Sequence, residues 1–153
     1  MSEPQIASGQ TAPAIPLGIN SPKSRALPGI LLVEDQELVR EVAADILECE
    51  GYRVFRAQNA HEAKAIFQRY GGIVQLLITD VVLPGQNGLD LARELRSGSP
   101  GLRVLFVSGF AENTWTRRAH VEDEGLYLTK PFSADLLVRA VKALAARLET
   151  VIV

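Results

Sequence analysis

The stretch that decides the fold is residues 76–88, which read Leu-Leu-Ile-Thr-Asp-Val-Val-Leu-Pro-Gly-Gln-Asn-Gly. It begins with an apolar run that ends at one carboxylate, Asp80, and it continues into the chain-breaking residues Pro84, Gly85 and Gly88. A short apolar run bounded by glycine and proline is typical of a strand buried on both faces of a sheet. An acid at the exit of such a strand lies at the carboxyl edge of the sheet, where open α/β folds bind their ligands.

Four more short strands are predicted around this one. Three of them are continuous apolar runs, and the segment 52–57 alternates polar and apolar residues, which is typical of an edge strand with one face in water. In chain order the five predicted strands cover residues 30–33, 52–57, 76–79, 104–107 and 126–129.

Segments with helical spacing of apolar residues separate these strands. The expected helices are one that Gly51 ends, one that Asn59 begins, Leu89–Ser97, a weakly patterned one over Glu112–His120, and 134–149 after the cap Ser133. In the first helix one stripe holds Leu38, Val42 and Ile46, with Val39, Ala43 and Leu47 beside it. The last helix is expected to face inward with Leu136, Leu137, Ala140, Val141, Leu144 and Leu148.

This alternation of strands and helices predicts the fold class. Apolar strands joined by helices form a parallel sheet with helices on both faces, built from right-handed crossovers. We therefore expect an α/β, flavodoxin-like (βα)5 doubly wound parallel sheet. The strand order 2-1-3-4-5 fits because the second strand has the pattern of an edge strand.

Composition limits the functional classes. The chain has 153 residues, of which 47% are hydrophobic and 22% charged, and these values are ordinary for a globular protein. A net charge of −2 gives no reason to expect direct binding to nucleic acid or to a membrane. No apolar run approaches the ~20 residues that span a bilayer. The chain has one cysteine, Cys49, which cannot form a disulfide within the chain, so we expect the protein in a reducing cytoplasm.

The N-terminal segment differs from the rest of the chain. Residues 1–28 hold five of the eight prolines and only three charged residues, and they lack apolar periodicity. This composition predicts a flexible tail. One domain is expected over residues 29–150.

Polar side chains stand where four of the five predicted strands end. These residues are Glu34 and Asp35 after strand one, Asp80 after strand three, Ser108 after strand four and Lys130 after strand five. The carboxyl ends of parallel strands meet at one edge of the sheet, and a crevice opens between strands one and three. We therefore expect these side chains to converge.

Such a cluster requires a cation, or one of its acids must take up a proton. Two carboxylates ~5 Å apart at an effective dielectric of ~20 repel by roughly 3 kcal/mol. A lysine offsets part of this repulsion, and a site of oxygen ligands that keeps several waters suits Mg²⁺. A carboxylate, a lysine and a hydroxyl around Mg²⁺ form an arrangement for phosphoryl transfer, with Asp80 as the nucleophile and Lys130 and Ser108 as partners of the phosphoryl oxygens.

Four motifs carry a family resemblance. They are Leu-Leu-Val-Glu-Asp at 31–35, Thr-Asp-Val-Val-Leu-Pro-Gly-Gln-Asn-Gly at 79–88, Val-Ser-Gly at 107–109 and Tyr-Leu-Thr-Lys-Pro-Phe at 127–132. Through these motifs the chain from about Ile30 to Ala146 resembles the receiver domain of two-component response regulators. In the residues of these motifs it most resembles receivers associated with sensor histidine kinases.

The resemblance implies a phospho-accepting signalling domain and not an enzyme, because its only chemistry is the self-catalysed phosphorylation of Asp80. The donor would be a phosphohistidine of a sensor histidine kinase. Mg²⁺ would be bound by Asp35, Asp80 and the backbone carbonyl of Val82, with Glu34 acting through a water molecule.

The resemblance also implies how the phosphoryl group would be detected. Ser108 and Lys130 would contact it, Tyr127 would swing inward as an aromatic switch, and the bond before Pro131 would be cis. The output would reach a downstream protein target through the face of helix 4, strand 5 and helix 5. A homodimer is a further possibility, through Arg117 and Arg118 and the acidic residues 122–124.

Several alternatives stay open at this point. No output domain follows the last helix, which favours a single-domain response regulator, and the alternative is the receiver module of a hybrid sensor histidine kinase. From a different class, a flavodoxin-like ligand-binding module would need a hydroxyl- and glycine-rich phosphate loop where this chain has Glu34 and Asp35. A haloacid-dehalogenase-type hydrolase would need an acid at Val82.

Overall fold

Five parallel strands form one sheet. The computed structural model describes residues 27–109 and 126–152. Neighbouring strands in the order β3-β2-β4-β5-β6 are hydrogen-bonded in parallel, which confirms the predicted order 2-1-3-4-5. The strands are β2 (Gly29–Val33), β3 (Arg53–Ala57), β4 (Val74–Asp80), β5 (Arg103–Ser108) and β6 (Leu126–Thr129).

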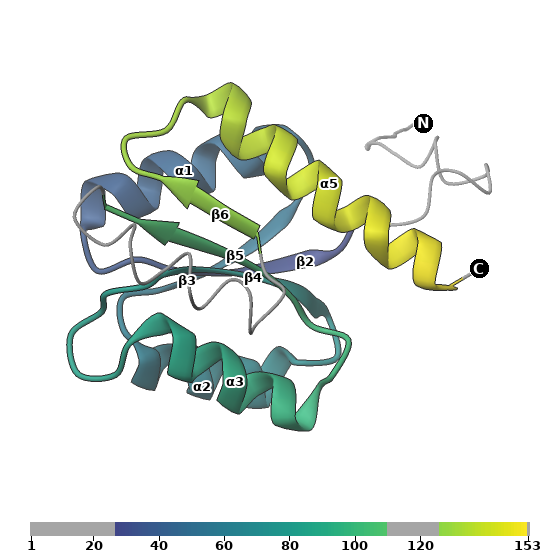
Figure 1. The fold of residues 1–153 in the computed structure, drawn as a ribbon, viewed down its shortest axis with the longest axis horizontal. Helices are drawn as coiled ribbons and strands as arrows, with labels where there is room; N and C mark the ends of the chain where they lie inside the picture. Colours follow the sequence, from purple (N-terminus) through teal and green to yellow (C-terminus); the bar gives the residue numbers. More distant parts are fainter. Residues whose placement is uncertain (1–26, 110–125, 153) are drawn as a thin grey trace, which may run out of the picture.

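Helices cover both faces of the sheet (Figure 1). On one face lie α1 (Glu37–Cys49) and α5 (Ala134–Ile152), and on the other lie α2 (Ala60–Tyr70) and α3 (Gly88–Gly98). The flavodoxin-like, doubly wound architecture is therefore confirmed. The expected helix at 112–120, the possible dimer contacts at 117–124 and all but the last two residues of the expected tail lie outside the described residues.

The core consists of two apolar clusters, one on each face of the sheet. Along β4, Leu77 points into the cluster under α2 and α3, whereas Leu76 and Ile78 point into the cluster under α1 and α5. All three side chains are at most 2% exposed. Burying a leucine or isoleucine side chain contributes about 1.5–3 kcal/mol. The alternation sends Thr79 toward α3 and Asp80 toward α1.

Three predicted helix ends are confirmed. After α1, Gly51 has a φ of +99°, and the N–H groups of Gly51 and Tyr52 donate to the carbonyls of Glu48 and Leu47. This is a Schellman motif, which needs a residue in the left-handed region. At the starts of α2 and α5, the side chains of Asn59 and Ser133 accept from backbone N–H groups, at 2.8 and 3.1 Å.

Two predicted apolar stripes are only partly buried. On α1 the buried residues are Ala43, Ala44 and Leu47, whereas Leu38 is 77% and Val42 is 49% exposed. The buried face therefore holds Ala43 and Leu47, which the sequence placed beside the stripe of Leu38 and Val42.

On α5 the prediction for Leu136 was wrong, because this side chain is 48% exposed. Among the side chains of this helix that the structure describes, Leu137, Val141 and Leu144 are buried, and they follow the spacing i, i+4, i+7 of a single face. The side chain of Leu148, which was also expected to face inward, lies outside the described ones. Leu136 stands one residue before that face.

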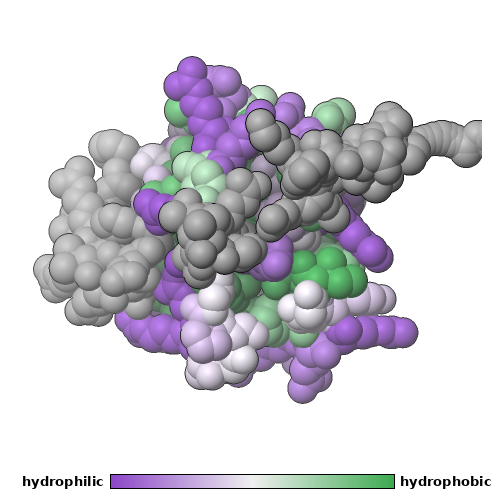
Figure 2. Space-filling view, turned by 90° about the vertical axis from the view of Figure 1, so that its right-hand side faces the viewer, coloured by the Kyte–Doolittle hydropathy of each residue, from purple (hydrophilic) through white to green (hydrophobic). Residues whose placement is uncertain are grey.

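The end of the sheet where the strands begin is mostly hydrophilic, with a small hydrophobic patch (Figure 2). Leu27 and Ile73 precede β2 and β4 at this end and are 46% and 44% exposed. Among the described residues, no helix has the length and apolar composition that a membrane crossing requires.

Candidate functional site

The register of the central strands brings two acids together. Val33 of β2 is paired with Thr79 of β4, so the next residue of each strand, Glu34 and Asp80, lies at the same level of the sheet edge. One carboxylate oxygen each from Glu34, Asp35 and Asp80 lies within 4.8 Å of the others. The predicted convergence of the three acids is therefore present in the structure.

Lys130 follows the edge strand β6 and reaches the same carboxylates across the end of β5. Its Nζ lies 2.9 Å from Oε1 of Glu34 and 3.0 Å from Oδ1 of Asp80. We refer to Glu34, Asp35, Asp80 and Lys130 as the acidic site. It holds one ammonium group and three carboxylates, so it carries an excess of negative charge.

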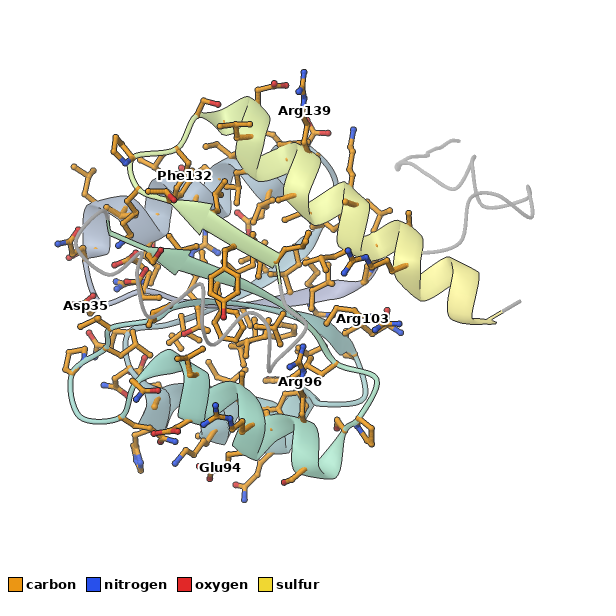
Figure 3. The ribbon with its side chains drawn as sticks, viewed as in Figure 1. Asp35, Glu94, Arg96, Arg103, Phe132 and Arg139 are labelled. Carbon is orange, nitrogen blue, oxygen red and sulfur yellow. The ribbon has the colours of Figure 1, made fainter. Side chains whose placement is uncertain are left out.

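Burial makes this excess costly. Glu34 and Asp80 are 3% and 5% exposed, whereas Asp35 is exposed. Behind Glu34 and Asp80 lies a cavity of about 10 Å³, which has room for one water molecule at most. In Figure 3, Asp35 and Phe132 mark this end of the molecule, and Arg96 and Arg103 lie toward the opposite end.

The pKa values of the two buried acids move apart. Burial, a hydrogen bond with Glu34 and the charge of that residue together raise the pKa of Asp80 to about 8. Lys130 lowers the pKa, but by less than these causes raise it. Burial would also raise the pKa of Glu34, but hydrogen bonds from the Gln36 N–H, Asp80 and Lys130 hold it below its usual value. Without a further cation, Asp80 therefore keeps a proton at neutral pH.

The backbone of β5 holds Lys130 in place. Ser108 and Thr129 are paired in the β5–β6 register, and the N–H of Lys130 donates to the carbonyl of Ser108 at 2.8 Å. Ser108 is 2% exposed at the end of its strand. The Lys130–Pro131 peptide bond is cis.

The other two predicted site residues are close to the acidic site along the chain, with Val82 two residues after Asp80 and Tyr127 three residues before Lys130. Val82 follows β4 and is 51% exposed. Tyr127 lies in β6 and stacks on Phe106, with ring centroids 5.0 Å apart. Phe106 stands two residues before Ser108, so the tyrosine ring packs against the strand that ends in this hydroxyl.

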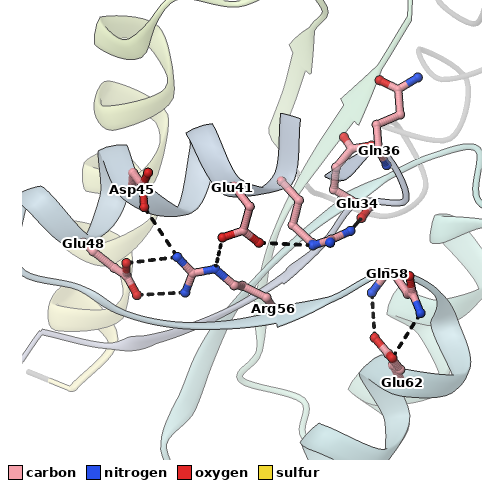
Figure 4. A network of polar contacts seen from close by, with 9 residues as sticks. Glu34, Gln36, Glu41, Asp45, Glu48, Arg56, Gln58 and Glu62 are labelled. Atoms are coloured by element: carbon pink, nitrogen blue, oxygen red, sulfur yellow. Dashed lines mark hydrogen bonds and ion pairs between the residues drawn. The ribbon is translucent and has the colours of Figure 1, made fainter. Parts of the chain in front are cut away.

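Sequence analysis missed residues that form hydrogen bonds with Glu34 and with the backbone of Asp80. The N–H of Gln36 donates to Oε2 of Glu34 at 3.0 Å, as Figure 4 shows. The guanidinium of Arg40 donates to the Glu34 carbonyl, and the Thr79 hydroxyl donates to the Asp80 carbonyl. These contacts involve backbone atoms, so no pattern of residue types indicates them.

The acidic site combines the groups that phosphoryl transfer to a carboxylate requires. The side chain of Asp80 offers a carboxylate, and the ammonium of Lys130 lies 3.0 Å from its Oδ1. Oxygen ligands at this spacing fit a small divalent cation, which would neutralise the excess charge and favour the ionised form of Asp80.

Comparison with known proteins identifies the family. The family model of the response regulator receiver domain matches residues 30–142. The chain belongs to this family. The receiver domain is the signalling module of two-component systems, and the match covers all five strands of the sheet except Gly29.

Two curated relatives are similar over about three quarters of the chain. The sensor kinase CckA of Brucella abortus is 39% identical over 113 residues, which cover 74% of this chain and 12% of the kinase. The aerobic respiration control protein ArcA of Escherichia coli is 39% identical over 117 residues, which cover 74% of this chain and 47% of ArcA. The receiver thus spans half or less of these relatives.

Solved structures have the same fold. A receiver domain of the hybrid histidine kinase CckA is 33% identical with a TM-score of 0.64, covering 76% of this chain and 97% of that one. A CheY-like receiver domain from Methanospirillum hungatei is 26% identical with a TM-score of 0.74, covering 81% and 98%. The similarity thus extends both to CheY-like receivers and to receivers of hybrid kinases.

Proposed function

We propose that this receiver takes a phosphoryl group onto Asp80 from a phosphohistidine of a sensor histidine kinase. The observation that carries the proposal is the geometry of Asp80, which is buried at the end of β4 with the ammonium of Lys130 3.0 Å from its Oδ1 and with Glu34 and Asp35 beside it. An Oδ of ionised Asp80 forms a bond to phosphorus, the phosphorus–nitrogen bond breaks, and the imidazole nitrogen leaves with the electron pair and takes up a proton. A cytoplasmic location is proposed with it.

The donor set of the acidic site fits Mg²⁺. Asp35 and Asp80 would bind the ion together with the backbone carbonyl of Val82, and Glu34 would act through a water molecule. All of these are oxygen ligands, which Mg²⁺ prefers. When bound, Mg²⁺ supplies positive charge for the phosphoryl oxygens. Its fit rests on the three carboxylate oxygens within 4.8 Å of one another.

Two side chains would detect the phosphoryl group. The ammonium of Lys130 already faces Asp80, and it would pair with a phosphoryl oxygen after transfer. The Ser108 hydroxyl would donate a hydrogen bond to another oxygen. Because Tyr127 packs on Phe106 two residues before Ser108, a shift of Ser108 would be passed to Tyr127 and to the surface around β6 and α5, where a downstream protein would bind.

The donor would dock beside Lys130. A groove of about 450 Å³ ends at this residue, and its wall is formed by Leu38, Val39, Val42, Ala43, Pro131 and Phe132. Leu38 and Val42 are 77% and 49% exposed on neighbouring turns of α1. Exposed apolar residues at the spacing i, i+4 fit the apolar face of a partner helix.

The decisive experiment is mass spectrometry of the full chain after incubation with acetyl phosphate and Mg²⁺. We expect a mass gain of one phosphoryl group, and peptide mapping should assign it to Asp80. A stable modification at any other residue, or no modification, would contradict the proposed function. A Leu38→Asp variant should keep its reaction with acetyl phosphate while losing transfer from a histidine kinase.

A further inference from the structure

The backbone around Asp80 holds an unusual polar contact. Thr79 lies in β4 between Leu77 and Val81, which both belong to the apolar cluster under α2 and α3. Its side chain is completely buried, and its hydroxyl donates to the carbonyl oxygen of Asp80 at 2.9 Å. A buried hydroxyl in an apolar layer stabilises a particular backbone geometry only where its hydrogen bond is made. Here the bonded group is the peptide that follows the nucleophile.

A glycine, Gly88, packs closely against the same carbonyl group. Gly88 is the buried first residue of α3. A Cβ on this residue would lie well inside van der Waals contact with the Asp80 carbonyl oxygen, 2.9 Å from the carbonyl carbon and 3.0 Å from Oγ1 of Thr79. No residue other than glycine fits here without displacing the backbone of Asp80.

Two more hydrogen bonds hold the neighbouring peptide groups. The N–H of Val81 belongs to the same peptide as the Asp80 carbonyl, and it donates to the carbonyl of Val107 in β5 at 2.9 Å. The carbonyl of Val81 accepts from the N–H of Gly88 at 2.7 Å. The peptide after Asp80 is thus held at both its carbonyl and its N–H, and the next peptide, which leads to Val82, is held by Gly88.

We propose that Thr79 and Gly88 are positioning residues, which orient the Asp80 carboxylate and the Val82 carbonyl by fixing the two peptide groups between them. The inference rests on the proposed function and deepens it, because it concerns the geometry of the same site. The orientation of the peptide after Asp80 sets the direction of its side chain. A displacement of about 1 Å in a reacting group costs about 10²-fold in rate.

The test compares four variants of the full chain. Thr79→Val removes the hydroxyl with little change of shape, and Thr79→Ser restores it. Gly88→Ala adds one methyl group against the Asp80 carbonyl. Gly98→Ala is its matched control, because Gly98 is the last residue of the same helix and a Cβ there meets nothing within 4 Å.

Two quantities are measured at a temperature where circular dichroism shows each variant fully folded. They are the rate of Asp80 phosphorylation by acetyl phosphate and the dissociation constant of Mg²⁺ from an NMR titration. We expect Gly88→Ala and Thr79→Val to lower the rate about tenfold or more and to weaken Mg²⁺ binding. Thr79→Ser and Gly98→Ala should stay within about twofold of the wild type.

A purely structural role would lower the melting temperature and leave both quantities unchanged in the folded protein, and that result for Thr79→Val would overturn the inference. If Gly88→Ala does not fold, the Thr79 pair still decides the question. If the wild type takes up no phosphate, the proposed function fails, and the Mg²⁺ titration of the same variants still tests whether Thr79 and Gly88 position the ligands.

Discussion

Two clusters in this receiver each contain three carboxylates but have different environments. The acidic site combines three carboxylates with Lys130. The Arg56 cluster combines the carboxylates of Glu41, Asp45 and Glu48 with Arg56, and Arg40 lies 3.5 Å from Glu41 as a second cation (Figure 4). Arg56 is in the edge strand β3, and its three partners stand on α1. Two nitrogens of Arg56 lie 2.9 Å from Glu41 and Glu48.

The difference between the clusters is burial. Side chains of the Arg56 cluster are 29–73% exposed, and the hydrogen bonds to Arg56 lower the pKa of Glu48. In the acidic site two carboxylates are buried beside each other, and the pKa of Asp80 is raised to about 8. Three carboxylates near water thus form ordinary ion pairs, whereas three carboxylates at a buried site leave an under-neutralised group with a raised pKa.

The largest expected effect separates the clusters by function. Asp80→Asn should abolish phosphorylation by acetyl phosphate, because the amide is not a nucleophile for phosphorus at neutral pH. Asp45→Asn is the matched control in the Arg56 cluster and should leave the reaction unchanged. Intact-mass analysis measures both, and equal phosphate uptake by Asp80→Asn and the wild type would contradict the assignment.

Lys130→Ala should destabilise the metal-free protein by about 2 kcal/mol at pH 7, since it leaves the buried charge of Glu34, beside protonated Asp80, without a counter-charge. The value is reduced because about a quarter of the lysine side chain is exposed. Urea unfolding without Mg²⁺ measures this loss. The folded variant should still accept phosphate slowly but should lose the phosphorylation-dependent change in partner affinity. An unchanged free energy of unfolding would show that Lys130 does not neutralise the site.

Stability of the metal-free protein should depend on pH through Asp80. Its pKa is about 8 in the folded state and about 3.8 in the unfolded state, so the folded protein binds more protons between these values. Its contribution is complete below about pH 4 and is lost as pH rises toward 8, by on the order of 2 kcal/mol. The lowered pKa of Glu34 acts in the opposite direction, but only below about pH 4.5.

Urea unfolding at pH 5 and pH 8.5 measures this dependence. Asp80→Asn should remove most of the decrease, and saturating Mg²⁺ should reduce it in the wild type by favouring the ionised carboxylate. If the free energy of unfolding of Asp80→Asn decreased as much between these pH values as that of the wild type, another titrating group would be responsible for the pH dependence.

The smallest effect is expected in the Arg56 cluster. Arg56→Ala should lower the free energy of unfolding by about 1 kcal/mol, because exposed ion pairs contribute little even in a network. The loss should shrink in high salt, whereas the effect of Lys130→Ala should change less, since buried charges are screened less. Urea unfolding of both variants in low and high salt measures these losses. If Arg56→Ala lowered the free energy of unfolding as much as Lys130→Ala does, the proposed energetic difference between the two clusters would be wrong.

The sequence by itself determined the order of elements and the chemistry at the strand ends. Short apolar runs predicted the five strands, the edge pattern of residues 52–57 placed the second strand, and Asn59 and Ser133 marked helix starts. These signals are local, because the side chain or φ angle that produces each of them belongs to the segment itself.

Only the tertiary structure decided how the site is assembled. Lys130 and Asp80 are 50 residues apart, and the β2–β4 register that places Glu34 beside Asp80 is a property of two paired strands. The exposure of Leu38, the raised pKa of Asp80 and the contact of Gly88 with the Asp80 carbonyl likewise depend on which segments pack together. Burial and close contact arise between segments that are distant in the sequence, so the residue pattern of one segment does not contain them.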